Sequence, residues 1–494
     1  MKRYKGLDKS EMKTTMRIKQ EEWTIPQFIY LILLGSLLLD YMVIQAFDRE
    51  LYSFPAVIAL ARIAVSVMGI CLGRLWRDKG FWLLSALMVI QIVRVAFING
   101  QLFFYDSVND SIINGIWAIS GCYALGKVLS AKKVKAFLRI LLVAWAIGML
   151  IHCTIALYAA WNDLRIQNLS GGSIWGIPLS NWGSEWPDRL SVGYVYSTIA
   201  GSTLSLSGVL ALIGLLAEPK KWIKAIYGLA LLIIVIALSL TDSRTSIISL
   251  AAGMGVITCS SVLWLIWKKR KTNDQENRGE HGRPWIAWVT AIACMILVFV
   301  VSTLAIMKIV PIFNTMKVRG QLIVASAQAE ETEPIKQQVV SRGLSGIDVL
   351  SGRGEIWEKV LKFITGSRKR LLFGESIYNP METLNQETGS TMGHCHNMLL
   401  QILLESGIVG LLPVLLFGIY SAKNAFRIIN SKISPLWLRI IPAIPASVLV
   451  GDLAECFGWF RQWKVPALAF MFIAFGIINA HDDRKINHQE EYLA

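Results

Sequence analysis

The sequence is built from long apolar blocks that alternate with short basic segments. Of its 494 residues, 54% are hydrophobic and 17% are charged, and the mean hydropathy is +0.50. Each block has about 20 residues, the length that a helix needs to cross a bilayer. Because open backbone cannot face lipid, the blocks are expected to be helices. The twelve predicted spans are approximately Gln27–Ala46, Ser53–Gly73, Phe81–Ile98, Asp110–Leu129, Phe137–Ala160, Val195–Ala217, Trp222–Leu240, Ser246–Trp267, Trp285–Val310, His396–Tyr420, Ile440–Phe457 and Val465–Ala480.

The distribution of Lys and Arg predicts how these spans are oriented. With the N-terminus inside, the seven inner segments hold 30 of the 49 basic residues, and the five short outer loops hold 6. Lys and Arg collect on the cytoplasmic side of a membrane. Both termini are therefore predicted to be cytoplasmic. The net charge of +15 reflects this orientation, and no nucleic-acid partner is expected.

The predicted fold class is an all-α polytopic membrane protein with about 12 transmembrane helices and a large extracytoplasmic loop. No cleavable signal peptide is expected, because the basic start leads directly into a full-length span. The plasma (inner) membrane is the expected location. The predicted organisation is a basic cytoplasmic N-terminus (1–26), nine helices (27–310) with an outer loop at 161–194, a large extracytoplasmic loop (311–395), three helices (396–480) and a cytoplasmic tail (481–494).

The outer loop Trp161–Tyr194 carries four tryptophans among glycines and prolines: Trp161, Trp175, Trp182 and Trp186. Tryptophans at this depth usually anchor a protein in the lipid headgroups. Their flat faces also stack on sugar rings. The sequence leaves both interpretations open.

The large outer segment contains SGRGEIWEKVLKFITGS, with Trp357, Val360, Leu361 and Ile364 at helical spacing. This pattern predicts a short amphipathic helix that lies on the outer leaflet and ends at Gly366. Arg353 stands just before its first turn, between two glycines. A flexible backbone with free N–H groups can approach an anion closely there.

The stretch HCHNMLLQILLESGIVGLL, from His394 to Leu412, places polar residues inside an apolar span. Asn397, Gln401 and Glu405 are four residues apart and therefore share one helix face. Polar groups in a membrane usually face the bundle interior. The stripe is expected to brace the histidine's helix or to bind a headgroup, and Gly407 and Gly410 would permit close helix approach.

Four motifs together resemble the O-antigen ligase and O-antigen polymerase superfamily. They are LTDSRTSIISL (Leu240–Leu250), SGRGEIW, LLFGES (Leu371–Ser376) and the stretch that begins HCHN. The resemblance covers about a third of the chain, and elsewhere the agreement is in hydropathy and span count. His394 is an additional histidine, and Cys395 occupies a position that is often small in the family. His396 matches the family histidine because it precedes Asn397.

The resemblance implies a fold like that of the multispanning polyprenyl-phosphosugar glycosyltransferases. It also implies transfer of a glycan from a polyprenyl-diphosphate carrier to a sugar hydroxyl at the outer face. The acceptor would be a lipid core in a ligase, or another glycan in an O-antigen or capsular polysaccharide polymerase. Arg244 and Arg353 are suited to bind the diphosphate, since guanidinium groups stay protonated and bind phosphate through two N–H groups. His396 is the predicted general base, with Ser243, Asn397, Gln401 and Glu405 in support. No cofactor is expected.

Two possible metal sites were weighed. His394 and His396 form a pair with no aspartate close by in the sequence, and two histidines alone make a poor site. Asp48-Arg49-Glu50 resembles an acidic motif of other multispanning glycosyltransferases, but a three-residue match occurs readily by chance. No metal is predicted.

Charged residues also lie inside the predicted spans. Arg62 and Arg94 are interpreted either as ligands of the lipid diphosphate or as ion-pair partners of Asp452 and Glu455, with pairing favoured.

A flippase for lipid-linked oligosaccharides is the alternative functional class. Such a transporter would show internal repeats and no large one-sided loop. The sequence shows no repeat, and the segment from Arg353 to His396 has no counterpart in the first half.

Overall fold

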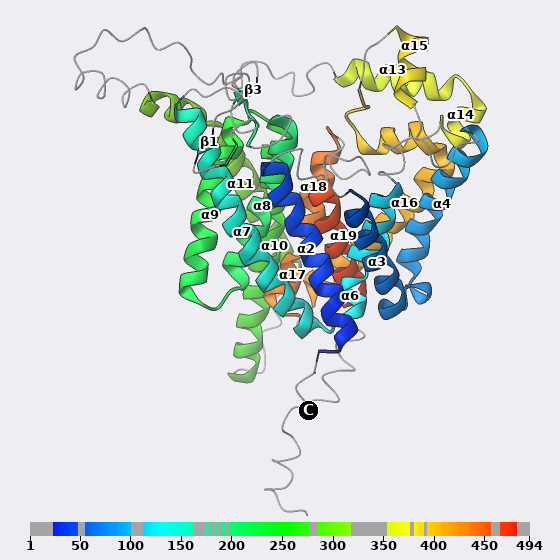
Figure 1. Ribbon diagram of the computed structural model, residues 1–494. Helices are drawn as coiled ribbons and strands as arrows, with labels where there is room; N and C mark the ends of the chain where they lie inside the picture. The colour runs from blue at the N-terminus through cyan, green and yellow to red at the C-terminus, as the bar shows by residue number, and fades with distance from the viewer. Residues whose placement is uncertain are drawn as a thin grey trace, which may run out of the picture.

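The protein is a bundle of long helices with a cap of short helices at one end (Figure 1). In this computed structural model, the described residues are 23–47, 55–99, 112–162, 173–174, 177–178, 184–185, 189–192, 197–276, 284–317, 353–375, 380–389, 393–431, 433–455 and 465–481. Among them, six helices are long and apolar enough to cross a membrane, and five further apolar helices are shorter. The predicted all-helical polytopic class is confirmed, while the number of spans and the large loop stay predictions.

The long helices coincide with the predicted apolar blocks. They are α2 (Ile25–Phe47), α3 (Pro55–Gly73), α4 (Lys79–Asn99), α7 (Ala131–Trp161), α8 (Ser197–Ala217), α9 (Lys221–Leu240), α10 (Arg244–Glu276), α11 (Pro284–Met307), α16 (Met398–Asn430) and α19 (Val465–Ala480).

Two of the predicted blocks are not single α-helices. The block at Asp110–Leu129 contains a π-helical segment, η3 (Trp117–Cys122), followed by α6 (Leu125–Val128). The block at Ile440–Phe457 contains α17 (Leu436–Ile440) and α18 (Ala443–Asp452). Pro442 lies between these two helices, where it lacks the N–H group that would continue the backbone hydrogen bonds of α17.

The core of the bundle surrounds α19. From Pro466 to Ala480 every side chain of this helix is buried, and α6, α16, α18 and η3 pack around it. A helix that is apolar on all sides is stable in a protein core or in a membrane, and α19 takes the first of these positions. Aromatic edge contacts fill the space, with Phe470 against Trp145 at 4.9 Å and Phe475 against Phe417 at 5.0 Å between ring centroids. Helices far apart in the sequence are thereby fixed relative to one another.

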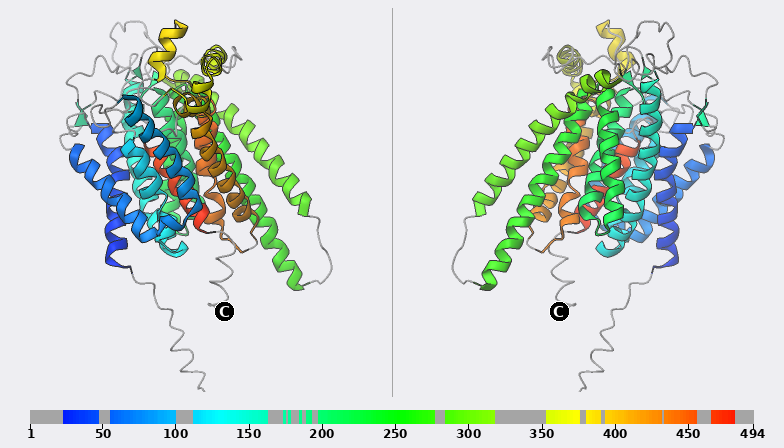
Figure 2. Two further views of the ribbon diagram at one scale, coloured as in Figure 1. Left: turned by 90° about the vertical axis from the view of Figure 1, so that its right-hand side faces the viewer. Right: turned by 90° about the vertical axis from the view of Figure 1, so that its left-hand side faces the viewer.

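The pair α10 and α11 leans away from the rest of the bundle (Figure 2). Most of the apolar surface of α11 is exposed, as expected of a helix that faces lipid. The helical residues continue to Lys317, so the predicted start of the large loop at Pro311 is wrong. This extension packs on the end of α7: Lys317 donates from Nζ to the carbonyl of Ala160 at 3.1 Å, and Phe313 lies edge-on to Trp161.

The cap consists of α13 (Arg353–Thr365), α14 (Arg368–Phe373) and α15 (Pro380–Thr388). The predicted amphipathic helix is present as α13, and it ends before Gly366 as expected. Part of its apolar face packs on protein, while Leu361 stays exposed. Val360, Phe363 and Ile364 are buried against Leu384 of α15 and Leu404 of α16. Contact with this protein surface removes their apolar area from water, as contact with lipid would.

The outer segment at 161–194 contains two short antiparallel strand pairs. They are β1 (Ser173–Ile174) with β2 (Ile177–Pro178), and β3 (Ser184–Glu185) with β4 (Arg189–Leu190). Three of the four tryptophans of this segment lie outside the described residues, as does the Asp48-Arg49-Glu50 motif.

Candidate active site

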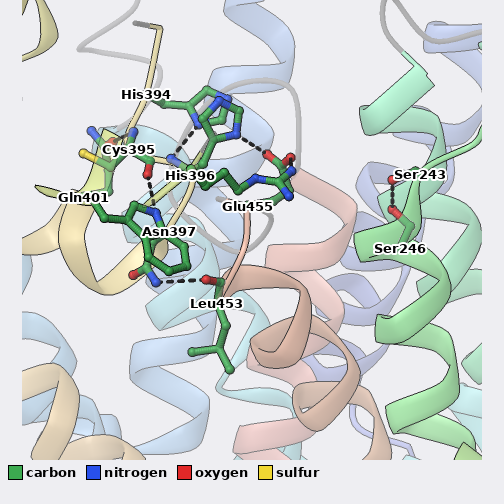
Figure 3. Close-up of polar contacts among 11 residues, drawn as sticks. Ser243, Ser246, His394, Cys395, His396, Asn397, Gln401, Leu453 and Glu455 are labelled. Atoms are coloured by element: carbon green, nitrogen blue, oxygen red, sulfur yellow. Dashed lines mark hydrogen bonds and ion pairs between the residues drawn. The ribbon is translucent and has the colours of Figure 1, made fainter. Parts of the chain in front are cut away.

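The histidine predicted as a base lies in a charged cluster at the capped end of the bundle (Figure 3). His396 Nδ1 is 3.1 Å from Glu455 Oε2. The other oxygen of the same carboxylate, Oε1, accepts a hydrogen bond from Arg353 Nη2 at 2.5 Å. One carboxylate therefore joins the histidine to the arginine, although the three residues come from three different segments.

Local sequence explains how His396 is held. Its backbone has φ of 50°, a left-handed conformation that is uncommon outside glycine. The N–H of His396 donates to Nδ1 of His394 at 3.1 Å, and the two rings are 3.9 Å apart between centroids. The additional histidine of this sequence thus supports the turn that presents His396.

Asn397 connects the two helices that carry the histidine and the carboxylate. It is the N-cap of α16, and its Oδ1 accepts from Leu400 N at 3.1 Å. Its Nδ2 donates to the carbonyl of Leu453, two residues before Glu455, at 2.9 Å. An asparagine at this position therefore satisfies a free helix N–H and fixes the distance between His396 and Glu455.

The polar stripe of α16 faces the interior, as predicted. Gln401 and Glu405 are both buried. Gln401 accepts from the N–H of Cys395 at 3.0 Å and donates to Glu405 Oε1 at 2.6 Å. From the other side, Trp357 of α13 donates to the carbonyl of Cys395 at 3.2 Å. The stripe braces the backbone of the histidine turn.

A break in α16 receives the Phe-Gly turn that follows α14. Gly407 has φ of 62° inside the helix, and Gly374 has φ of 69°. A Cβ atom on Gly407 would lie 2.4 Å from the carbonyl oxygen of Leu372, and one on Gly374 would lie 2.4 Å from the N–H nitrogen of Ser406. Glu375 N donates to the carbonyl of Leu404 at 2.6 Å. Glycine at both positions allows this backbone contact, which anchors the cap over the site.

Arg244 is the first residue of α10, at the same end of the bundle. α10 and α18 pack antiparallel. Ser249 of α10 donates to the carbonyl of Ser447 of α18, and Gly253, further along α10, lies near Ala443, which comes earlier in α18. Arg244 is five residues before Ser249, and Asp452 is five residues after Ser447. At 1.5 Å per residue, both lie about 7.5 Å further toward the cap. Arg244 is thus level with Asp452, three residues before Glu455.

Ser243 does not face the cluster. Its hydroxyl is 2.7 Å from that of Ser246, and both are buried on α10 (Figure 3). α8 passes closely here, because a Cβ on Gly201 would lie 2.8 Å from Ser243 Cβ. The contacts of Ser243 are those of a residue that packs the start of α10.

A further arginine binds the turn between α9 and α10. Arg189 of β4 donates to the carbonyls of Thr241 at 2.9 Å and Asp242 at 3.2 Å. Asp242 has φ of 50°. Arg189 is therefore bound to the turn that leads into Arg244. This contact was not predicted from the sequence, although an arginine in an outer loop was a visible signal.

The contacts of Glu455 within the cluster were not predicted from the sequence. Arg62 and Arg94 were considered as its partners, whereas the structure shows it bound to Arg353 and His396. Arg62 instead donates to Asn114 at 2.7 Å and lies 5.9 Å from the centroid of the Trp117 ring. The side chain of Arg94 lies outside the described residues. Glu455 ends a predicted span on the side where the span of His396 begins, which was an available signal.

The cap is held by an ion-pair network on α14 and α15. Arg370 binds both Glu375, at 3.1 Å, and Glu387. The hydrogen bond from Arg370 holds the pKa of Glu387 below its ordinary value. Arg370 also lies over the ring of Phe363, 4.0 Å from its centroid. This network fixes α14 against α13, whose first residue is Arg353.

The cluster also has the composition of a metal site. Donor atoms of His394, His396 and Glu455 all lie within 4.8 Å of one another. In the sequence the two histidines have no carboxylate close by, and in the structure Glu455 supplies one. Both oxygens of that carboxylate already have partners: Oε1 binds Arg353, and Oε2 binds His396.

Comparison with known families bears on the chemistry of this cluster. A family described as O-antigen ligase matches residues 229–415. Residues 229–415 are therefore similar to this family. The predicted resemblance to the O-antigen ligase and polymerase superfamily is confirmed, and it supports a membrane glycosyltransferase of this type. No curated protein matches the chain.

The matched residues include part of the cluster. Arg353 and His396 lie inside them, as does Arg244 at the start of α10. Glu455 lies after them, and Arg189 lies before them. Two charged side chains at this end of the bundle therefore come from segments that flank the matched residues.

Proposed function

We propose that this protein transfers a glycan from a polyprenyl-diphosphate carrier to a sugar hydroxyl at the outer face of the membrane. The observation that carries the proposal is the contact of His396 with a carboxylate that also binds Arg353, both of them among the residues similar to the O-antigen ligase family. A base and an anion-binding cation are thereby placed side by side. These are the two groups that the reaction requires.

His396 is the general base in this proposal. Glu455 accepts from Nδ1–H, so the neutral imidazole keeps its lone pair on Nε2. Nε2 removes the proton of the acceptor hydroxyl as the oxygen attacks the anomeric carbon. The new glycosidic bond forms while the bond to the diphosphate oxygen breaks, and polyprenyl diphosphate leaves with the electron pair. Glu455 stabilises the imidazolium that results.

Arg353 and Arg244 bind the diphosphate. A guanidinium has five N–H groups, and Arg353 uses one nitrogen, Nη2, in its bond to Glu455. The remaining N–H groups are available to phosphate oxygens, where fixed cations stabilise the charge of the leaving group. Arg244 approaches from α10 at the level of Asp452, and Arg189 adds positive charge at the turn that precedes it. Diphosphate is a good leaving group, so no general acid is needed.

The test is a reaction of the purified protein with a polyprenyl-diphosphate oligosaccharide in detergent. We expect release of polyprenyl diphosphate together with a joined glycan. A protein that moves the intact lipid across a vesicle membrane and releases no diphosphate would contradict the proposal and support a flippase.

The His396→Ala variant examines the base directly. We expect its turnover to fall by about 10²–10⁴-fold, the usual contribution of a general base. The matched control is His481→Ala, which removes a buried histidine at the end of α19, far from the cap. Its turnover per folded molecule is expected to stay close to that of the wild type. Equal turnover of His396→Ala and wild type would exclude the base.

A chelator separates the metal-free mechanism from a metal-dependent one. We expect EDTA to leave turnover unchanged, because Arg353 and His396 already occupy the two oxygens of Glu455. Loss of activity that divalent metal restores would instead assign His394, His396 and Glu455 to a metal site.

A further inference from the structure

A cavity of about 230 Å³ lies at the end of the bundle opposite the cap. It is enclosed by the start of α7, the end of α8, the start of α9 and α17. α17 leads into α18, which ends at Asp452, three residues before Glu455, so the cavity and the His396 cluster are at opposite ends of the bundle. The distribution of Lys and Arg predicts that the cavity is on the cytoplasmic side.

The walls of the cavity divide into a basic rim and an apolar floor. Lys132, Lys135 and Arg139 form the rim on one face of α7, at the three- and four-residue spacing that aligns side chains along a helix. The floor is apolar and buried, and is made by Leu138, Leu142, Ile213, Trp437 and Ile441. A ligand that satisfies both parts must be an amphiphile with an anionic head.

The charges of the rim are not equally available. Arg139 forms two hydrogen bonds with the buried Glu218, at 2.6 and 2.7 Å, and the same carboxylate accepts from Lys220 N at 3.0 Å. Lys132 and Lys135 are exposed and have no ion-pair partner among the described residues. Two lysines therefore remain to bind an anion at the mouth of the cavity.

The surroundings place the mouth at the membrane surface. Leu216 of α8 and Trp222 of α9 are exposed beside residues that line the cavity, and Lys220 and Lys221 lie between them. Exposed Trp and Lys at a helix end are typical of the headgroup region. An acyl chain can thus pass from the apolar floor to the lipid-facing side of α8 and α9.

We propose that this cavity binds one anionic phospholipid from the cytoplasmic leaflet. Its phosphate contacts Lys132 and Lys135, and part of an acyl chain occupies the floor. Basic pockets between transmembrane helices on this side of a membrane recognise anionic headgroups in this way. Because the lipid contacts α7, α8, α9 and α17 together, it stabilises the junction of these helices.

The experiment uses the full chain purified in a neutral detergent. Phosphatidylglycerol is added, and lipid retention is measured by native mass spectrometry together with the unfolding temperature. We expect one retained phosphatidylglycerol and a higher unfolding temperature. Phosphatidylcholine and inorganic phosphate are the parallel additions, and neither is expected to reproduce both effects.

Two variants connect the result to the cavity. Lys132→Gln/Lys135→Gln removes the free rim charges and is expected to weaken the apparent affinity for phosphatidylglycerol by about 30-fold. Ala136→Trp fills the mouth without changing charge, because Ala136 is an exposed residue of the lining, and it is expected to abolish retention. The matched control is Lys269→Gln/Lys423→Gln, which removes two exposed charges at the same end but outside the cavity.

The proposal is overturned if the rim variant and the control variant lose affinity equally, since binding would then follow net charge alone. It is also overturned if Ala136→Trp retains phosphatidylglycerol as the wild type does, or if phosphatidylcholine binds as tightly. An equal effect of inorganic phosphate would assign the lysines to a free anion and exclude a lipid.

Discussion

Two carboxylates at opposite ends of the bundle are each paired with a cation, and they differ in what else surrounds them. At the uncapped end, Asp78 binds Lys127 Nζ at 2.6 Å, accepts from Tyr123 OH at 2.8 Å and accepts from Phe81 N at 2.9 Å. At the capped end, Glu455 binds Arg353 and His396. The side chain of Asp78 is 7% exposed, whereas the side chain of His396, the partner of Glu455, is 31% exposed.

The difference separates a structural cluster from a candidate reactive one. The Asp78 cluster continues into buried partners, since Asn479 donates to Tyr123 OH and accepts from Lys127 through its carbonyl. It links α4, α6 and α19 internally. The Glu455 cluster is assembled from three chain segments, one of which holds His396 in a left-handed conformation, and it leaves the imidazole partly exposed. The first arrangement fixes helices, and the second presents a base.

The largest expected effect on stability comes from breaking the Asp78 cluster. Asp78→Asn leaves Lys127 without its counter-charge in a buried position, so we expect a loss of about 3–5 kcal/mol in the free energy of unfolding. Turnover per folded molecule should be unchanged. The measurement is the unfolding temperature in detergent beside the diphosphate-release assay. Adding Lys127→Met should recover part of the lost free energy of unfolding. An Asp78→Asn protein as stable as the wild type would contradict a stabilising role of the Asp78–Lys127 pair.

The same cluster predicts a dependence on pH. Burial raises the pKa of Asp78, but Lys127 and the hydrogen bonds from Phe81 and Tyr123 outweigh it, so the pKa is below its ordinary value. A folded-state pKa below the unfolded one gives a contribution that is complete above about pH 4 and is lost as pH falls through the folded pKa. The difference in unfolding temperature between wild type and Asp78→Asn should therefore shrink only below about pH 4. A difference that shrinks already between pH 5 and 7 would contradict the assignment.

Gly407→Ala tests whether the cap positions the reactive cluster. The left-handed backbone at Gly407 costs an alanine about 1–3 kcal/mol, and its Cβ meets the carbonyl of Leu372. We expect lower stability and turnover reduced by up to about 100-fold, because Arg353 belongs to the cap and is displaced when the cap is displaced. Gly418→Ala is the matched control on the same helix, where a Cβ meets nothing within 4 Å. It should be neutral or slightly stabilising, and equal behaviour of the two variants would exclude the cap contact.

Asn397 gives the smallest expected effect. Asn397→Ala removes the N-cap and the bond to Leu453, so we expect a loss of about 1 kcal/mol. Asn397→Asp keeps the cap acceptor and loses only the donor to Leu453. It should retain stability while turnover falls. The unfolding temperature reports the helix cap, and the turnover reports the bond to Leu453. Identical losses of both quantities in the two variants would show that these two roles of Asn397 are not separate.

The sequence predicted the parts of this molecule that depend on local or periodic signals. The length of the apolar blocks predicted the helices, and the spacing of four predicted that Gln401 and Glu405 share the buried face of α16. The helix at Arg353 was also found, but what covers its apolar face was not. An apolar helix face can be removed from water by lipid or by protein, here by the surface that Leu384 and Leu404 make. The periodicity of the sequence is the same in both cases.

The contacts of Glu455 and Arg189 could not be predicted, because they join segments that are distant in the chain. Glu455 is 102 residues from Arg353 and 59 from His396. Asp78 is different, since its contact with Phe81 N is a local helix cap that proximity in the sequence suggests. A pairing across the bundle depends on how α13, α16 and α18 pack, which a single sequence does not specify.

The most direct test of the account is a double-mutant cycle between His396 and Glu455. Turnover is measured by release of polyprenyl diphosphate for wild type, His396→Ala, Glu455→Gln and the double variant. If Glu455 orients the base and holds Arg353 beside it, the double variant loses much less than the product of the two single losses. Single losses that simply multiply would show that the two residues act independently, and the proposed cluster would be wrong.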